Sequence, residues 1–547
     1  MPSWTTPQNR IAISPVLAQL APSVASVHSP WPIHILVLLF LSVVAGLRLW
    51  FLCLTAEFSL ASDEAHYWDW SRHLDWCYYS KGPLVAWLIR ASCWLWGEDV
   101  MQAVRLPAMI CNFLTVLGIY ILVYRIFRSA SLGLVAVLAA HTLPFLHVGG
   151  LLMTIDAPYT CAWTWAVLLA HIILFSEERK SVFWWCLLGL IVAVGVLAKH
   201  NMALFVPSLG LFLLISPEHR KELLRPGFWV MSCIGGILGG GPILWWNAQH
   251  DWVTFLHVGT QAAGQGEASL RWIGPLEFVS TQAGIMMGFW FVLMIIGFVQ
   301  VLREYWKGSF HAQQMFLVCL ALPMLLICLV FSFKVRIEPN WPITAYITGL
   351  IVAGWMLWER RHVTVWRRTA WGFAFAGLLL SILIHGADVL YPAHAYFFPN
   401  VSPRKWDATC RLKGWTTLAV RVEELRQAQT GPTMLFGSNW SYTGALAFHL
   451  PDQPTVYCLG PVAGSRQSQY DFWRPNPLHD PDKFSGQDAI IVGDISPEVK
   501  AAFEKLEPTQ LVQAKQHGLI IAEWNVTVAR KLKPTGFGEK WLEHIRH

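Results

Sequence analysis

Residues 33–54 read IHILVLLFLSVVAGLRLWFLCL, a nearly continuous apolar run that contains a single arginine. A helix of about 20 residues, at about 1.5 Å each, covers the hydrocarbon core of a bilayer. The run lies too far into the chain and is too long to be a removable signal sequence. We therefore predict that residues 33–54 form the first of several membrane-spanning helices.

The composition of the whole chain supports this prediction. Of its 547 residues, 55% are hydrophobic and only 14% are charged, which excludes a disordered protein, a fibrous protein and an ordinary water-soluble enzyme. A soluble core cannot hide this much apolar surface. The net charge of +6 is typical of a membrane protein with basic cytoplasmic loops, so we expect no nucleic-acid partner.

Further apolar stretches bring the prediction to roughly 11 spans, all within residues 33–388. They lie at residues 100–124, 130–148, 156–175, 182–198, 202–216, 227–246, 274–302, 314–333, 341–358 and 369–388. Basic loops alternate with loops that carry few cations, and the positive-inside rule assigns the basic loops to the cytoplasm. This orientation predicts a multi-pass protein of the inner (plasma) membrane, with residues 1–32 in the cytoplasm and the first outer loop at 55–99.

Residues 389–547 are much richer in charge and are predicted to form a small soluble α/β domain on the extracytoplasmic (periplasmic) side. Strand-like runs at 433–436, 455–459, 489–492 and 519–528 alternate with helical patterns at 414–428 and 496–506. If this side is oxidising, Cys410 and Cys458 are candidates for a disulfide.

Acids and aromatic residues concentrate at the start of the first outer loop, where residues 62–73 read SDEAHYWDWSRH. A helix here would carry its tryptophans at the membrane interface, and an interfacial anchor is the simplest interpretation. That interpretation does not explain the adjacent carboxylates of Asp63 and Glu64. Ionisable residues at a membrane boundary tend to be functional, so both are candidate catalytic acids.

Cations on the same predicted face suit an anionic headgroup such as phosphate. Lys81 and Arg105 bracket the region where the second span begins, although snorkelling side chains would explain them equally well. Asp156 lies at the outer end of its predicted span, where an acid acts as a helix cap, pairs with a cation or takes part in function.

Several strings together resemble one family. DEAHYWDW at 63–70, YSKGPL at 79–84, VRLP at 104–107, WNAQHDW at 246–252 and EPNWP at 338–342 are similar to strings of family 39 glycosyltransferases. These include the protein O-mannosyltransferases and the lipid A aminoarabinose transferases. In the tail, RLKGW at 411–415 and SQYDFW at 468–473 resemble bacterial members.

The resemblance implies a GT-C fold and a membrane glycosyltransferase. Such enzymes take a sugar from a polyprenyl-phosphate carrier and pass it, with inversion, to an acceptor on the outer face. The resemblance implies that Asp63 is the main catalytic carboxylate, Asp156 a second essential acid, and Lys81 a neighbour of the donor phosphate. Ser80 and Gly82 depart from the Glu and Pro of the aminoarabinose transferases, which argues against a metal site that depends on that Glu.

Transfer from a lipid phosphate needs a base, cations for the leaving phosphate and an apolar groove. Asp63 is the predicted base. The predicted phosphate ligands are Lys81, Arg105, Lys199, Arg271 and Arg336. The predicted acceptor or substrate ligands are His66, Tyr67, Tyr79, Asn247, His250, Asp251, Glu338 and Asn340, although a capped loop helix explains Asn247, His250 and Asp251 equally well.

The sequence allows alternatives for the metal, the acceptor and the class of function. A divalent metal at Asp63, His66 and Asp69 is an alternative to metal-independent chemistry. The acceptor is an envelope glycan, a lipid or a protein, so both lipid A modification and protein glycosylation fit. The rival functions are a transporter or flippase of a lipid-linked or anionic substrate and a structural membrane subunit, but a transporter would gather its charges near the midplane in repeated halves.

Overall fold

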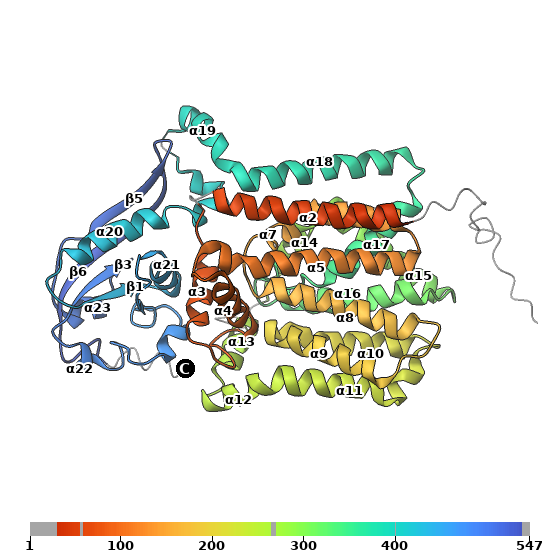
Figure 1. Ribbon diagram of the computed structural model, residues 1–547, viewed down its shortest axis with the longest axis horizontal. Helices are drawn as coiled ribbons and strands as arrows, with labels where there is room; N and C mark the ends of the chain where they lie inside the picture. Colours follow the sequence, from red (N-terminus) through yellow and green to blue (C-terminus); the bar gives the residue numbers. More distant parts are fainter. Residues whose placement is uncertain (1–29, 55–57, 264–269, 400, 539–547) are drawn as a thin grey trace, which may run out of the picture.

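The computed structural model describes residues 30–54, 58–263, 270–399 and 401–538. Long helices form a bundle, and a sheet domain built from the end of the chain lies against one end of that bundle (Figure 1). The fold class is therefore as predicted, a helical polytopic membrane protein with a small C-terminal α/β domain. The predicted cytoplasmic segment 1–32 lies almost entirely outside the described residues.

The bundle helices follow the predicted apolar stretches. Among the described residues, six helices are long and apolar enough to cross a membrane. They are α2 (Trp31–Leu54), α5 (Met101–Phe127), α8 (Asp156–Phe175), the helix Pro226–Ala248, α15 (Phe289–Trp306) and α16 (Ala312–Ser332). A bent pair, α18 (Thr364–Gly386) followed by α19 (Tyr391–Phe397), makes up to seven.

Shorter apolar helices lie among the long ones. They are α4 (Leu84–Trp96), α6 (Ala130–His141), α9 (Val182–Ala198), α10 (Phe205–Ile215) with the 3-10 turn His200–Leu204 before it, and α17 (Ala345–Glu359). The count of roughly 11 spans stays a prediction, because several of these helices are shorter than the bilayer core requires.

Two of the predicted stretches, 130–148 and 274–302, are interrupted, and a third, 227–246, stays one helix that changes its hydrogen-bond pattern within its length. The stretch 130–148 divides into α6 and α7 (Pro144–Val148), because proline has no N–H to continue the preceding helix. The stretch 227–246 runs through α11 (Pro226–Ile234), a glycine-rich π-helical turn and α12 (Gly241–Gln249). The stretch 274–302 divides into α14 (Gly274–Ile285) and α15, where Met287 and Gly288 have positive φ.

The short helix α3 (Ser62–Ser71) lies between the bundle and the C-terminal domain (Figure 1). Eight of its ten residues are buried. The Trp68 ring meets the Phe448 ring of the C-terminal domain edge-on at 5.0 Å, and the Trp70 ring stacks on Tyr78 at 4.4 Å. The expectation of an interfacial anchor is therefore wrong for these tryptophans, because protein covers both rings.

The C-terminal domain contains a six-stranded mixed sheet in the order β2-β1-β3-β6-β4, with β5 also paired to β6. The strands are β1 (Thr433–Gly437), β2 (Tyr457–Cys458), β3 (Asp488–Val492), β4 (Phe503–Leu506), β5 (Gln510–Gln516) and β6 (Leu519–Leu532). Strands β1, β2 and β3 are parallel, and β3, β4 and β5 pair antiparallel to β6. Helix α21 (Trp440–His449) packs between this sheet and α3.

Two expectations for this domain are wrong. The predicted helix 496–506 stops early, because α23 (Pro497–Ala502) is followed by β4, which pairs with the long strand β6 and buries Phe503. Cys410 and Cys458 do not pair, since both are free and buried in different surroundings. The Cys410 sulfur lies 3.1 Å from the Tyr391 hydroxyl.

Trp68→Ala is expected to destabilise the protein by about 3–5 kcal/mol, because it opens a cavity where α3 meets the C-terminal domain. Thermal unfolding of the purified protein in detergent measures the effect. The matched control is Trp94→Ala on α4, where the residue is 75% exposed and the expected loss is much smaller. Equal losses in the two variants would contradict the assigned packing.

Candidate functional site

Two adjoining cavities lie where the first outer loop meets the bundle and the C-terminal domain. The lysine cavity, of about 210 Å³, is lined by residues that include Lys81, Lys199 and His200. The aspartate cavity, of about 120 Å³, is lined by residues that include Asp63 and Lys81. Ser80, Lys81 and Gln261 line both cavities, so the two spaces meet at Lys81.

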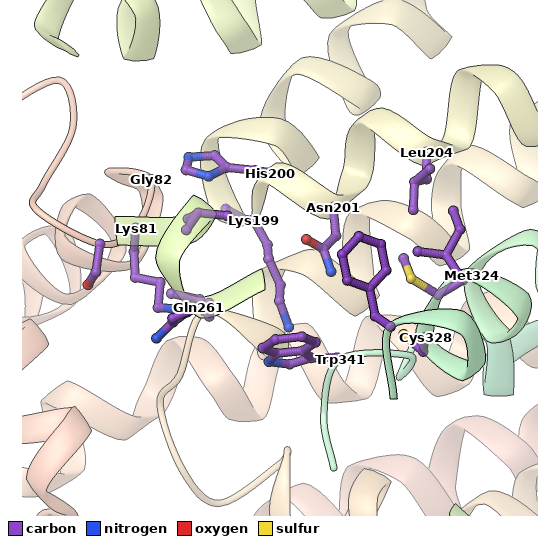
Figure 2. Close-up of a pocket in the computed structure, with 16 residues that line it drawn as sticks. Lys81, Gly82, Lys199, His200, Asn201, Leu204, Gln261, Met324, Cys328 and Trp341 are labelled. Atoms are coloured by element: carbon purple, nitrogen blue, oxygen red, sulfur yellow. The ribbon is translucent and has the colours of Figure 1, made fainter. Parts of the chain in front are cut away.

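The lysine cavity is polar at one end and apolar at the other. Figure 2 shows Lys81 and Gln261 at one side, Lys199 beside Trp341, and Leu204, Met324 and Cys328 at the opposite side. Ile327 and Phe331 of α16 complete the apolar wall. A cavity with cations at one side and apolar side chains at the other (Figure 2) suits a ligand with an anionic head and a hydrocarbon tail.

Asp156 positions Lys199 at this cavity. The Lys199 ammonium donates to Asp156 Oδ1 at 2.7 Å, and the Asn340 side-chain amide donates to Asp156 Oδ2 at 2.6 Å. Asp156 occupies the first turn of α8, and Lys199 follows directly on α9. Both carboxylate oxygens of Asp156 are thus used within the protein, which favours an orienting role.

Lys81 reaches the junction of the cavities because the chain after it lies directly on α9. A Cβ at Gly82 would stand 2.2 Å from the Leu197 carbonyl oxygen, so only glycine fits there. Burial and the neighbouring Lys199 ammonium lower the pKa of Lys81. A ligand anion at this junction would relieve the repulsion between the two lysines.

Asp63 is the acid of the aspartate cavity. Its side chain is accessible from the cavity and forms no salt bridge within the described part of the chain. Restricted hydration raises the pKa of Asp63, and the charges of Lys81 and Arg466 partly oppose the shift. A carboxylate with a raised pKa and no fixed partner is suited to accept a proton.

Aromatic residues of the first outer loop and the C-terminal domain complete this cavity. Three of the predicted substrate ligands, His66, Tyr67 and Tyr79, line it. Burial lowers the pKa of His66 to about 3, so its ring is neutral. Trp440 and Arg466 of the C-terminal domain also line it, and the Trp440 ring lies 5.3 Å from the His66 ring.

Glu64 does not reach either cavity, although it is adjacent to Asp63 in sequence. Its carboxylate receives Arg105 Nε at 2.9 Å and Arg105 Nη2 at 2.7 Å, and both side chains are almost wholly buried. The backbone N–H groups of Ala61 and Met153 donate to the same carboxylate at 2.8 Å. The pair is closed to ligands, so we assign Glu64 no catalytic role and Arg105 no phosphate contact.

Arg271 and Arg336 lie apart from Lys81 and Lys199. They line a third cavity of about 440 Å³ that shares no residue with the other two. The Arg271 guanidinium donates to Glu277 at 2.7 Å. The five predicted phosphate cations therefore separate into three groups: Lys81 and Lys199 in the lysine cavity, Arg271 and Arg336 in the third cavity, and Arg105 in its pair with Glu64.

The other predicted substrate ligands lie outside the two cavities. Asn247 is buried and caps its own loop, where its Oδ1 accepts from the Thr254 N–H at 3.1 Å. His250 stacks on Trp246 at 3.8 Å, and Asp251 has positive φ in the turn that follows. Glu338 lines neither cavity. The capped-loop interpretation thus fits the first three residues.

Among the described residues, no three His, Cys, Asp or Glu side chains converge as a metal site requires. Asp69 pairs with Arg72 at 3.2 Å instead of meeting Asp63 and His66. The alternative of a metal at these three residues therefore has no support in their geometry.

Sequence reasoning missed Trp440, Gln261 and Arg466. Gln261 comes from α13 (Val253–Ala263), and the other two lie in the C-terminal domain, far from Asp63 along the chain. The nearest signal was the string SQYDFW, which starts two residues after Arg466.

Comparison with known proteins supports the resemblance noted from the sequence. Residues 80–246 match the family model described as dolichyl-phosphate-mannose-protein mannosyltransferase. The lipid A galacturonosyltransferase RgtD of Rhizobium johnstonii is 26% identical over 79% of this chain and 86% of its own. An undecaprenyl phosphate-alpha-4-amino-4-deoxy-L-arabinose arabinosyl transferase of Pectobacterium atrosepticum is 22% identical over 72% of each chain.

The fold also matches a solved structure. ArnT from Cupriavidus metallidurans, solved in the apo state and bound to undecaprenyl phosphate, has a TM-score of 0.56 to this chain at 16% identity. The match covers 90% of this chain and 97% of ArnT. This likeness concerns the fold.

Breaking the Glu64–Arg105 pair is expected to destabilise the protein by about 3–5 kcal/mol, because either partner alone would leave a buried charge. Glu64→Gln and Arg105→Gln test this by thermal unfolding, and the double variant Glu64→Gln with Arg105→Met should recover part of the loss. Full stability of both single variants would contradict the structural role.

Proposed function

We propose that this chain, a GT-C glycosyltransferase of the family 39-like superfamily, moves a sugar from a polyprenyl-phosphate carrier to a lipid acceptor. The observation that carries the proposal is Lys81, which lines both the lysine cavity and the aspartate cavity. The Lys81 ammonium thus lies between the apolar wall of the lysine cavity and Asp63, which forms no salt bridge with the described residues. The name of one relative, the lipid A galacturonosyltransferase RgtD, favours a lipid acceptor, and envelope glycans and proteins are the alternatives.

The donor binds through its phosphate and its isoprenoid chain. The phosphate lies between Lys81 and Lys199, whose repulsion it offsets. The isoprenoid follows the apolar wall formed by Leu204, Met324 and Phe331. ArnT, which shares the fold, was solved with undecaprenyl phosphate.

With the phosphate in the lysine cavity, the sugar extends past Lys81 into the aspartate cavity. The acceptor oxygen attacks the anomeric carbon there, and the Asp63 carboxylate takes its proton. The bond between the anomeric carbon and the phosphate oxygen breaks, and its electron pair leaves with the polyprenyl phosphate. Because base and leaving group lie on opposite sides of the anomeric carbon, the configuration inverts, as in inverting glycoside hydrolases.

Asp156 acts through Lys199 in this scheme. It fixes the ammonium beside the leaving phosphate and shares its second oxygen with Asn340. Asp156 is thus a positioning residue, and its loss would leave the Lys199 ammonium in the cavity but less firmly oriented.

The site lies at the end of the bundle that carries the C-terminal domain, which we assign to the periplasmic face of the inner membrane. This location favours a transferase over a transporter or flippase, because transporters bind their substrates near the midplane of the membrane. A structural subunit would have no use for an acid without a salt bridge in a cavity.

Asp63→Asn is expected to lower sugar transfer by about 10²–10⁴-fold, because the base is lost. Radiolabelled undecaprenyl-phosphate sugars and an envelope lipid extract are supplied to the purified protein in membranes. Donor binding should persist, since the phosphate contacts remain. Full transfer by Asp63→Asn would refute the role of Asp63, and movement of the lipid between leaflets without transfer would favour the flippase.

The rate of transfer is expected to rise with pH through the pKa of Asp63. The base must be deprotonated, and its pKa is raised above that of an ordinary aspartate, so activity falls as the pH is lowered through this raised value. A pH profile of kcat/KM checks this, with Asp480→Asn as a surface control that should keep the wild-type profile. A rate independent of pH across the acidic range would count against Asp63 as the base.

Lys199→Ala is expected to weaken binding of undecaprenyl phosphate by at least about 10-fold, because one of two phosphate cations is removed. Asp156→Asn should weaken it less, since the lysine stays but loses its anchor. Tryptophan fluorescence or calorimetry in detergent measures both. The control is Arg271→Ala in the separate third cavity, and an equal loss there would place the phosphate elsewhere.

A further inference from the structure

We propose that Arg466 of the C-terminal domain binds a negatively charged group on the transferred sugar, such as the carboxylate of a hexuronic acid. This inference rests on the proposed function and assigns the substrate class of the same site. Arg466 lines the aspartate cavity but not the lysine cavity, so it faces the space assigned to the sugar.

Aromatic rings, not acids, hold the Arg466 guanidinium in place. It lies 5.5 Å from the centroid of the Trp440 ring, and its Nη1 is 3.2 Å from His257 Nε2. Burial and the cations nearby lower the pKa of His257 to about 4, so the neutral ring accepts a hydrogen bond from Arg466. The His257 ring in turn packs on Tyr79 at 4.8 Å.

Arg466 has no acidic partner among the described residues, a property that it shares with Arg404, Arg411 and Arg474 of the same domain. Of these four arginines, Arg466 is the one that lines the aspartate cavity. Arg421, Arg426 and Arg530 each form a salt bridge with a glutamate or an aspartate. Within the described part of the chain, Arg466 forms none. Its planar fork of donors therefore stays available to a planar carboxylate, which it can bind through two parallel hydrogen bonds.

The charge of the cavity favours an anionic sugar over a cationic one. A sugar carboxylate beside Asp63 would be repelled unless a cation compensates, and Arg466 supplies that cation. An amino sugar would instead meet two cations, Lys81 and Arg466, against the one acid Asp63. The phosphate does not need Arg466, because Lys81 and Lys199 already serve it in the lysine cavity.

The experiment compares three lipids without any acceptor, so that an anion on the acceptor cannot contribute. Undecaprenyl phosphate, its galacturonic acid derivative and its galactose derivative are titrated against the full-length protein in nanodiscs. The two sugars differ only in a carboxylate against a hydroxymethyl group. Wild type should bind the galacturonic acid donor at least about 10-fold more tightly than the galactose donor, as a charge-assisted hydrogen-bonded pair allows.

Arg466→Gln should abolish this preference while leaving the affinity for undecaprenyl phosphate unchanged. Arg466→Lys keeps the positive charge but loses the planar guanidinium donors, so it should retain part of the preference for the galacturonic acid donor. The matched control Arg421→Gln removes an arginine that lines neither cavity and should keep the full preference. Thermal unfolding verifies that each variant is folded. The preference of the wild-type protein for the galacturonic acid donor tests the inference even if a variant fails to fold.

Equal wild-type affinity for the two sugar donors would overturn the inference. An equal weakening of all three lipids by Arg466→Gln would also overturn it, since the arginine would then bind the phosphate. Failure of the proposed function gives a different pattern, in which wild type binds none of the lipids and transfers no sugar. Transfer of neutral sugars alone would keep the proposed function and refute the role of Arg466.

Discussion

The buried ion pair between Glu64 and Arg105 holds the first outer loop on the membrane bundle. It joins α3 to α5, and through the Met153 N–H it also ties both to the turn before α8. Successive residues on a helix differ in direction by about 100°. When Glu64 is locked into the bundle, Asp63 points away from it and faces the cavity. One of two adjacent acids thus supports the fold, and the other is left without a fixed partner.

The cations near the site also divide into those that pair with an acid of the protein and those that do not. Arg105 is committed to Glu64, and Lys199 is oriented by Asp156, while Lys81 and Arg466 form no salt bridge with the described residues. A charge in a restricted cavity is costly unless a partner compensates it. This cost applies to the half-buried Lys81, whose charge a phosphate in the lysine cavity would compensate, whereas Arg466 is exposed and its guanidinium is accessible to a charged sugar.

The C-terminal domain is part of the site. Its helix α21 covers α3, and it brings Trp440 and Arg466 to the cavity that contains Asp63. Gly444 allows this close approach, since a Cβ there would stand 3.0 Å from the His66 backbone nitrogen. A C-terminal domain without a role at the site would not need such a close contact between α21 and α3.

Sequence alone predicted the membrane helices, because the bilayer imposes a length and an apolar composition that can be counted along the chain. It also predicted Asp63, Lys81, Asp156 and Lys199 as site residues, from their place at the predicted membrane boundary and from the family resemblance. It could not separate Asp63 from Glu64, or Lys81 from Arg105, Arg271 and Arg336, because residue type does not reveal which charges pair with each other. Those pairings, and the approach of Arg466 to Asp63 across some 400 residues of chain, depend on how α3 packs between the bundle and the sheet. Tertiary structure alone decided them, because burial and contact between distant segments determine which charged groups are neutralised and which remain for a ligand.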